Sequence, residues 1–358
     1  MHMADALVSP AVGGAMWAVS AGLAAWSAKR LKDERDERKA PLMGVLGAFV
    51  FTAQMINFTI PATGSSGHLG GGMLLAMLLG PHAAFLVLFS ILAVQALFFA
   101  DGGLLALGCN VFNMGFWTCF VAYPFVYRGI VGDRPTQTRL AAGATLAGVI
   151  GLQLGAFSVV LETLASGISE LPFGTFVLLM QPIHLGIGLV EGLVTTALVT
   201  FVWKARPEIL EMASASAPVR NVSLRPVLAG LGVAAILTGG ALSWFASTHP
   251  DGLEWSMRKT SGKEELPMPE EGLHAAIASI QEKTAFLPDY DFRKADESGE
   301  RADDPGPGPA AESGAEPAER WPSVHAGTSL SGLLGGAFVL IVAGLIGWAL
   351  RRTQPVAR

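Results

Sequence analysis

The stretch GGGMLLAMLLGPHAAFLVLFSILAVQALFFA (70–100) is apolar from end to end and is broken once, at Gly80-Pro81. Proline lacks a backbone donor and disfavours a helical conformation in the residue before it, so a helix is expected to end there. A helix that crosses the hydrocarbon core of a membrane takes about 20 residues. We therefore predict that residues 69–100 form two short spanning helices, with a re-entrant hairpin as the alternative.

The composition extends this interpretation to the whole chain. Hydrophobic residues make up 51% of the 358 residues and charged residues only 15%, against about 25% charged residues in a typical soluble domain. The mean hydropathy is +0.47. The 43 glycines suit helices that pack closely in lipid. These values predict an all-α polytopic membrane protein.

Seven further apolar runs surround the opening stretch, at 6–28, 41–60, 104–127, 138–165, 172–203, 224–246 and 330–350. Basic residues gather in the loops that the positive-inside rule assigns to the cytoplasm, at 29–39, 127–139, 204–225 and 351–352. With these loops inside, the amino terminus and the loop near 61–68 lie outside and the carboxyl terminus lies inside. Two crossings within 69–100 then give about nine transmembrane helices, seven before residue 210 and two after residue 223.

One acidic block interrupts the basic membrane body. Residues 251–320 hold 17 acidic and 8 basic residues, whereas the rest of the chain holds 16 basic and 12 acidic. We expect this block to lie within an extracytoplasmic loop, 247–329, whose Pro/Gly/Ala/Glu-rich part 303–320 is disordered. The stretch 270–283 is predicted to form a short amphipathic helix. The acidic charge argues against a nucleic-acid partner.

The opening residues, MHMADALVSP (1–10), place a histidine at position 2 and no basic residue before Lys29. Without a basic leader we expect no cleaved signal peptide. A free amino group, the deprotonated amide nitrogen of His2 and its imidazole Nδ1 close adjacent chelate rings around one metal ion. Planar nitrogen ligation suits Ni²⁺ or Cu²⁺, and imidazole also binds Co²⁺ and Zn²⁺.

The fourth ligand is expected from the loop NFTIPATGSSGHLGGG (57–72), which lies on the same predicted side and carries His68. Glycine lets this backbone turn tightly, and irregular backbone at membrane depth is tolerated where it lines a buried site. Asn57, Thr63 and Ser66 are candidates for holding the loop in place.

Two ionisable residues in the apolar run QPIHLGIGLVEGLVT (181–195) also attract interest. His184 and Glu191 are seven residues apart and share a helix face. Intramembrane ionisable residues serve function or pair internally. For His184, both a metal contact and a structural hydrogen bond remain open.

The opening MHMADALVSP, the TIPATGSSGHLGGGML stretch and the 181–195 run together resemble the CbiM/NikM family. Its members are the substrate-binding (S) components of energy-coupling factor (ECF) transporters for cobalt and nickel, which belong to the ABC transporters. The resemblance covers residues 1–210 and implies metal binding by Met1, His2 and His68. It also implies no resident cofactor, a location in the cytoplasmic membrane of a bacterium or archaeon, and two kinds of partner besides the lipid. These are a transmembrane coupling protein (CbiQ/NikQ-like) and a cytoplasmic ATPase (CbiO/NikO-like).

Residues 224–350 resemble a second unit, joined through a cytoplasmic linker at 211–223. STHPDGLEWS (247–256) and LPDYDF (287–292) match the PDGLE type of small component, related in role to CbiN/NikN. The long acidic insertion, roughly 259–320, departs from that pattern. It either gathers cations or separates the helices.

Two other functional classes compete with metal uptake. A membrane metalloenzyme using His68, His184 and Glu191 requires an open coordination site, and an S component for an organic vitamin requires an apolar pocket with aromatic residues near the outer face. The sequence has neither a GxxxxGK[ST] loop for ATP nor an HExxH motif. We therefore expect ATP hydrolysis in partner subunits. Cys109 and Cys119 are predicted to be small packing residues.

Overall fold

The computed structural model describes residues 1–34, 39–132, 135–169, 171–215, 223–269, 271–293 and 322–350. Almost all regular structure in these ranges is helical. The longer helices are α1 Pro10–Glu34, α2 Lys39–Gln54, α4 Pro81–Phe99, α7 Gln137–Ser166, α8 Phe173–Ala205, α10 Arg225–Gly240 and α13 Ala326–Leu350. The shorter helices are α3 Gly72–Leu79, α5 Leu107–Val111, α6 Arg128–Val131, α9 Pro207–Ala215, α11 Gly252–Ser261 and α12 Gly272–Thr284. Short 3₁₀ turns are η1 Asp5–Leu7, η3 Leu242–Phe245 and η4 Pro288–Tyr290.

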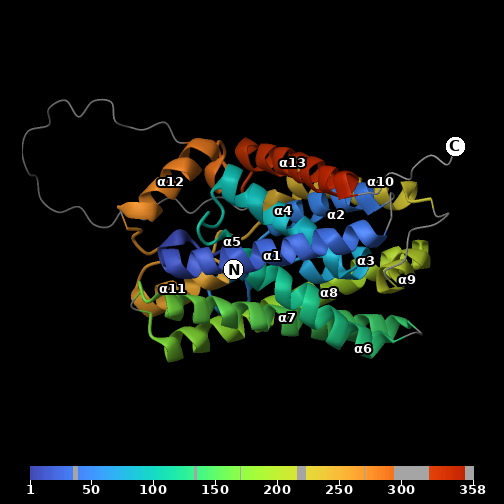
Figure 1. The fold of residues 1–358 in the computed structure, drawn as a ribbon, viewed down its shortest axis with the longest axis horizontal. Coiled ribbons are helices and arrows are strands. Elements are labelled where there is room, and N and C mark those ends of the chain that lie inside the picture. The colour runs from blue at the N-terminus through green and yellow to red at the C-terminus, as the bar shows by residue number, and fades with distance from the viewer. Residues whose placement is uncertain are drawn as a thin grey trace, which may run out of the picture.

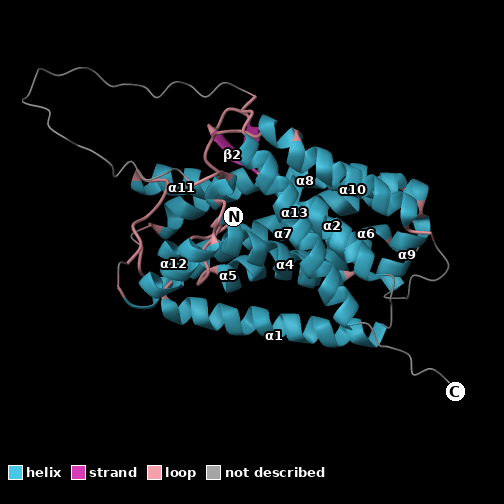
Figure 2. Ribbon diagram, turned by 90° about the horizontal axis from the view of Figure 1, so that it is seen from above, coloured by secondary structure: helices cyan, strands magenta, loops and turns pink. Residues whose placement is uncertain are grey.

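The long helices run side by side along the longest axis of the molecule, with α11 and α12 at one end and α6 and α9 at the other (Figures 1 and 2). α7 packs along α8, and α13 packs along α2. Glycine brings α7 and α8 close together. A Cβ at Gly188 would lie 2.9 Å from the Cα of Val149, and one at Gly192 would lie 2.5 Å from the Cα of Thr145. This close approach is typical of helices packed in lipid.

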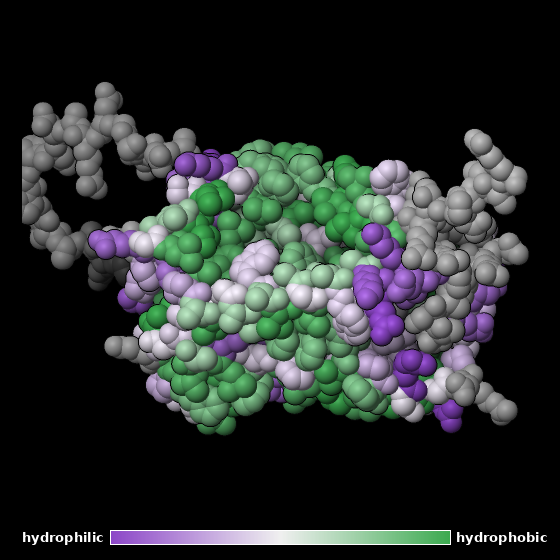
Figure 3. Space-filling model, in the orientation of Figure 1, coloured by the Kyte–Doolittle hydropathy of each residue, from purple (hydrophilic) through white to green (hydrophobic). Residues whose placement is uncertain are grey.

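Among the described residues, five helices are long and apolar enough to cross a membrane: α1, α4, α7, α8 and α13. α10 is a shorter apolar helix. Figure 3 shows apolar residues over the middle of the visible face and polar residues gathered toward its ends. This distribution confirms the predicted all-α, multi-pass class. The number of nine crossings stays a prediction.

The 69–100 stretch breaks where the sequence indicated, because α3 ends at Leu79 and α4 begins at Pro81. Gly80 makes the turn with φ +82°. α3, however, has eight residues and is about 12 Å long, whereas the hydrocarbon core is about 30 Å thick. α3 alone therefore cannot span a membrane.

The loop before α3 forms a small antiparallel hairpin, β1 Phe58–Ile60 with β2 Ser65–Gly67. Polar side chains form hydrogen bonds with the backbone amides and carbonyl groups that follow the hairpin. Glu191 accepts hydrogen bonds from the amides of Gly70 (2.7 Å) and Gly71 (3.1 Å), and Gln54 donates to the Gly70 carbonyl (2.8 Å). The irregular backbone is thus buried in protein with its hydrogen bonds made, as membrane depth requires.

Within the predicted run 104–127, a continuous helical stretch begins at Leu107, but the form of most of it was not foreseen. Residues Phe112–Tyr127, labelled η2, form a π-helical segment that contains Pro124. Proline removes a backbone donor from a helix, and long π-helical segments are rare. Hydropathy identifies the apolar run and gives no information on the width of its turns.

The second unit places α10 and α13 against α2, whereas α11 and α12 lie at one end of the helix bundle (Figure 1). α12 confirms the amphipathic helix predicted at 270–283. Asp251 caps α11 by accepting from Leu253 and Glu254, while the Glu254 side chain accepts from the Asp251 amide. The predicted disordered part, 303–320, and most of the predicted linker lie outside the described residues.

Candidate metal centre

The amino-terminal segment is fixed in the protein interior by residues of the 101–111 region. Asn110 accepts a hydrogen bond from the Met3 amide (2.7 Å) and donates to the Met3 carbonyl (3.1 Å). The Gly103 amide also donates to that carbonyl (2.9 Å). Asp5 accepts from the Ala106 amide (2.9 Å). These contacts position residues 1 and 2 independently of their own side chains.

His2 and His68 come together as the sequence predicted. Their rings are stacked with centroids 4.9 Å apart. His68 Nδ1 lies 3.0 Å from the Leu69 carbonyl, whereas Nε2 is buried with no hydrogen-bond partner in the described structure. Burial and the nearby amino terminus lower the pKa of His68 to about 4. The neutral ring donates through Nδ1–H and leaves the Nε2 lone pair available to a metal.

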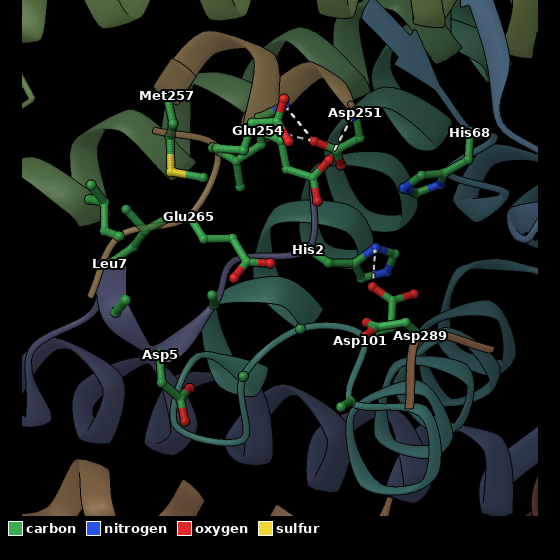
Figure 4. A pocket seen from close by; sticks show the side chains of 18 of the residues that line it. His2, Asp5, Leu7, His68, Asp101, Asp251, Glu254, Met257, Glu265 and Asp289 are labelled. Carbon is green, nitrogen blue, oxygen red and sulfur yellow. Dashed lines mark hydrogen bonds and ion pairs between the residues drawn. The ribbon is translucent and has the colours of Figure 1, made fainter. Parts of the chain in front are cut away.

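His2 is held by a carboxylate. Its Nδ1 lies 3.2 Å from Asp101 Oδ1, as Figure 4 shows. The Tyr290 hydroxyl donates to the other oxygen of Asp101. Burial and the amino terminus lower the pKa of His2 to about 3, so the ring is neutral near pH 7. Nδ1 is the nitrogen that the predicted chelate needs, and Asp101 therefore lies beside the predicted position of the metal.

The amino group of Met1 lies 3.2 Å from Asp251 Oδ2. Burial alone would raise the pKa of Asp251, but the adjacent ammonium group outweighs this effect and holds the pKa well below its usual range. The same carboxylate caps α11. The amino terminus and the second unit therefore meet at the predicted chelating nitrogen.

His184 lies beside this group, on α8. It is 0% exposed, its Nδ1 lies 2.8 Å from the Met180 carbonyl, and its Nε2 has no partner among the described residues. Met1, His68 and His184 line one small cavity, of about 10 Å³, together with Asp251 and Gly252. That volume is on the scale of one water molecule. His184 therefore makes the expected structural hydrogen bond through Nδ1 and also lines the cavity that Met1 and His68 share.

The remaining predicted residues support the loop. Thr63 donates to the Ile60 carbonyl (2.8 Å) and accepts from the Ser65 amide (3.0 Å), which closes the hairpin turn. Ser66 donates to the His249 carbonyl (2.7 Å). The Asn57 carbonyl accepts from the Ser247 amide (2.7 Å). Ser66 and Asn57 thus bind the loop to the second unit, and Glu191 binds it to α8.

Within the described ranges, no three His, Cys, Asp or Glu side chains are arranged to hold a metal ion. The predicted ligand set contains only two such side chains, because its other donors are an amino group and a backbone amide. His82 packs against Trp26 of α1, with ring centroids 4.6 Å apart. Trp26 lies about 24 Å along α1 from Pro10. His82 lies far from the metal centre. Cys109 and Cys119 are free and buried, as packing residues are.

Sequence reasoning missed the contacts that Asp101, Asn110 and Asp251 make with residues 1–3. It also missed the hydrogen bond from Tyr290 to Asp101. A partial signal existed for two of them. Asp251 belongs to the PDGLE motif and Tyr290 to LPDYDF, both already connected with the second unit. Nothing in the chain order links either motif to the amino terminus.

Comparison with known proteins identifies the chain. The model of the cobalt uptake substrate-specific transmembrane region (CbiM) matches residues 2–209, more than half of the sequence. The chain belongs to the CbiM family. A PDGLE domain matches residues 225–352. Both resemblances drawn from the sequence are thereby confirmed, and the enzyme alternative is excluded because the family consists of metal transport proteins.

Individual relatives agree with this assignment. The fused nickel transport protein NikMN of Rhodobacter capsulatus is 30% identical over 315 residues, which cover 81% of this chain and 88% of that protein. The cobalt transport protein CbiM of Geobacter sulfurreducens is 31% identical over 221 residues, which cover 59% of this chain and 61% of that protein. A crystal structure of a truncated transition metal transporter is 30% identical, with a TM-score of 0.51, and covers 57% of this chain and 99% of its own. The CbiM-family chain is therefore a multi-pass metal transport protein.

Proposed function

We propose that this CbiM-family protein is the substrate-binding component of an ECF transporter and captures Co²⁺ or Ni²⁺ on the extracytoplasmic side. Its ligands are the Met1 amino group, the His2 amide and imidazole Nδ1, and the His68 imidazole. The observation that carries the proposal is the convergence of these groups. The two neutral imidazoles stack at 4.9 Å, and Met1 and His68 line one cavity.

Capture replaces two contacts that the free protein makes. The proton of the neutral His2 ring moves from Nδ1, now facing Asp101, to Nε2, so that Nδ1 can bind the ion. The His2 amide loses its proton, and the Met1 amino group loses a proton and its contact with Asp251. Every nitrogen in the set must be unprotonated to bind the ion, so affinity rises with pH. The hydrogen bond between His68 and the Leu69 carbonyl fixes the ring with Nε2 toward the ion.

The loop 57–72 encloses the bound ion. Thr63 keeps the hairpin turn closed, Ser66 and Asn57 bind the second unit, and Glu191 holds the two glycines after His68. These residues set the position of His68 without touching the ion. His184 presents its free nitrogen to the same cavity from α8.

Release into the cell requires energy from outside the chain. We propose that a coupling protein of the CbiQ/NikQ type and an ATPase of the CbiO/NikO type bind this protein and reorient its helices after ATP hydrolysis. In this arrangement the amino terminus faces outward and the carboxyl terminus inward, in the cytoplasmic membrane of a bacterium or archaeon.

Calorimetric titration of the purified protein in detergent tests the ligand set. We expect Ni²⁺ and Co²⁺ to bind one per chain, with at least about 100-fold weaker binding in His68→Ala, because removing even a group that only orients a ligand costs 10–100-fold. His82→Ala is the matched control and should bind like wild type, since His82 lies on α4, beside Trp26 and far from the proposed ligands. Equal losses in both variants, or no metal binding by wild type, would contradict the proposal. Competition between the two ions then decides which is preferred.

A further inference from the structure

A cavity of about 510 Å³ adjoins the metal centre and is lined by both units of the chain (Figure 4). His2 and His68 lie in its wall. Its described lining contains no Lys or Arg, but it contains seven carboxylates. They are Asp5, Asp101, Asp251, Glu254, Glu264, Glu265 and Asp289. We call this cavity the vestibule.

Only two of these carboxylates have a cationic partner among the described residues. Asp251 contacts the Met1 ammonium group, and Glu264 contacts Arg258 at 2.7 Å. The other five have no described Lys or Arg side chain beside them. Uncompensated negative charge of this density in a concave wall produces a strong field that concentrates cations.

Two buried atoms add a separate indication of a ligand. His2 Nε2 has no hydrogen-bond partner in the described structure, although the His2 side chain is only 7% exposed. Asp5 Oδ2 is also unpartnered, in a residue that is 4% exposed. Buried polar atoms are nearly always satisfied. Both residues line the vestibule, and both unpartnered atoms are acceptors suited to a cation or to the water molecules around one.

We infer that the vestibule is a staging site that holds a hydrated divalent cation before the nitrogen ligands capture it. This inference rests on the proposed function. Carboxylate oxygens and water suit a hydrated ion and bind it more weakly than the nitrogen chelate does, so the ion moves onward. Asp251, Glu254, Glu264, Glu265 and Asp289 belong to the PDGLE unit. The staging site is therefore chiefly a contribution of that unit.

Neutralising exposed carboxylates of the vestibule tests the inference. Glu265 and Asp289 are exposed and have no described partner. Asn tolerates the left-handed conformation of Asp289, so the double variant Glu265→Gln/Asp289→Asn preserves the fold. The matched control is Glu271→Gln/Glu282→Gln, which removes two exposed charges from the same unit outside the vestibule.

The measurement is stopped-flow absorbance of Ni²⁺ binding to the full chain in detergent, at low and high ionic strength. We expect the vestibule variant to associate roughly ten-fold more slowly than wild type at about 10 mM salt, with an unchanged dissociation rate. At about 0.5 M salt the difference should fall below about two-fold, because salt screens the field. The control should associate at the wild-type rate throughout.

An unchanged association rate in the vestibule variant, or the same slowing in the control, overturns the inference. If the vestibule variant keeps the wild-type rate while His68→Ala loses binding, the staging site is wrong and the ligand set stands. If wild type fails to bind Ni²⁺ and Co²⁺, both the staging site and the ligand set are wrong.

Discussion

Inserting one alanine between Met1 and His2 changes the geometry of the metal centre without removing a side chain. Met3 is fixed by two hydrogen bonds to Asn110, of 2.7 and 3.1 Å. The chain from His2 onward therefore stays in place, and only the amino group moves. One residue displaces it by about 3.8 Å. This exceeds the 3.2 Å between the amino group and Asp251, so that contact breaks.

The insertion also changes the number of nitrogens that the terminus offers. In the ligand set proposed for the natural chain, the terminus supplies three nitrogens and His68 supplies the fourth. In the variant the amino group, two amides and the imidazole supply four nitrogens from one segment, an arrangement that suits planar Ni²⁺. The variant should bind Ni²⁺ without His68, and the loop 57–72 should no longer enclose the ion. Nickel uptake by cells should then fall.

A double-mutant cycle gives the expected size of this effect. In the natural chain, His68→Ala should weaken Ni²⁺ binding at least about 100-fold, which corresponds to about 2.7 kcal/mol. In the insertion background the same substitution should weaken binding less than about three-fold, or about 0.7 kcal/mol. The difference of about 2 kcal/mol is within the range found for directly interacting groups.

Calorimetric titration of the four proteins with Ni²⁺ measures the cycle, and uptake of radioactive nickel by cells measures transport. His82→Ala added to the insertion is the control and should change neither quantity further. A loss caused by His68→Ala that is equally large in both backgrounds would show that His68 is not the fourth ligand. Wild-type uptake by the insertion variant would contradict the proposed coupling between the loop and the terminus.

Three further substitutions probe the support of the site. Glu191→Ala leaves two buried amides without an acceptor, each costing about 1–3 kcal/mol. The melting temperature in detergent should therefore fall, and Ni²⁺ affinity should fall 10–100-fold. Glu191→Gln keeps one acceptor, so its melting temperature and affinity should lie between those of wild type and Glu191→Ala. Asn110→Ala removes both side-chain bonds to Met3 and should weaken affinity about ten-fold without affecting the hairpin, as hydrogen exchange at 58–67 will show. His184→Ala should weaken affinity 10–100-fold if the cavity-facing nitrogen contributes, and wild-type affinity in calorimetry would confine His184 to its bond with Met180.

Much of the fold was accessible from the sequence because lipid imposes simple requirements. Apolar length identified the long helices, and the Gly80-Pro81 break was placed correctly. Assigning the basic loops to the cytoplasm and counting the crossings between them placed residue 2 and the loop 57–72 on the same side, where His2 and His68 meet. The shortness of α3 and the π-helical turns of η2 were not accessible, since hydropathy averages over a window and does not register backbone geometry.

The support of the site was less accessible than its proposed ligands. Residues 1 and 2 were proposed from a motif tied to the start of the chain, and residue 68 from the glycine-rich loop on the same predicted side. Their neighbours come from distant segments, and the contact between Met1 and Asp251 spans 250 positions. The motif D-x-x-E at 251–254 predicts a capping box, which the structure contains. The contact of the same carboxylate with the Met1 amino group depends on tertiary packing, and the local sequence does not predict it.

The two contacts of Asp251 can be separated experimentally, and the separation shows whether the PDGLE unit holds the amino terminus. Asparagine caps helices as well as aspartate does, whereas alanine costs about 1 kcal/mol. In hydrogen exchange, the amides of Leu253 and Glu254 should stay protected in Asp251→Asn and exchange about five-fold faster in Asp251→Ala. The Met3 amide should lose protection in both variants, because both lose the ion pair with Met1. If Met3 stays protected in both, Asn110 alone holds the terminus, and the PDGLE unit does not position the chelating nitrogen.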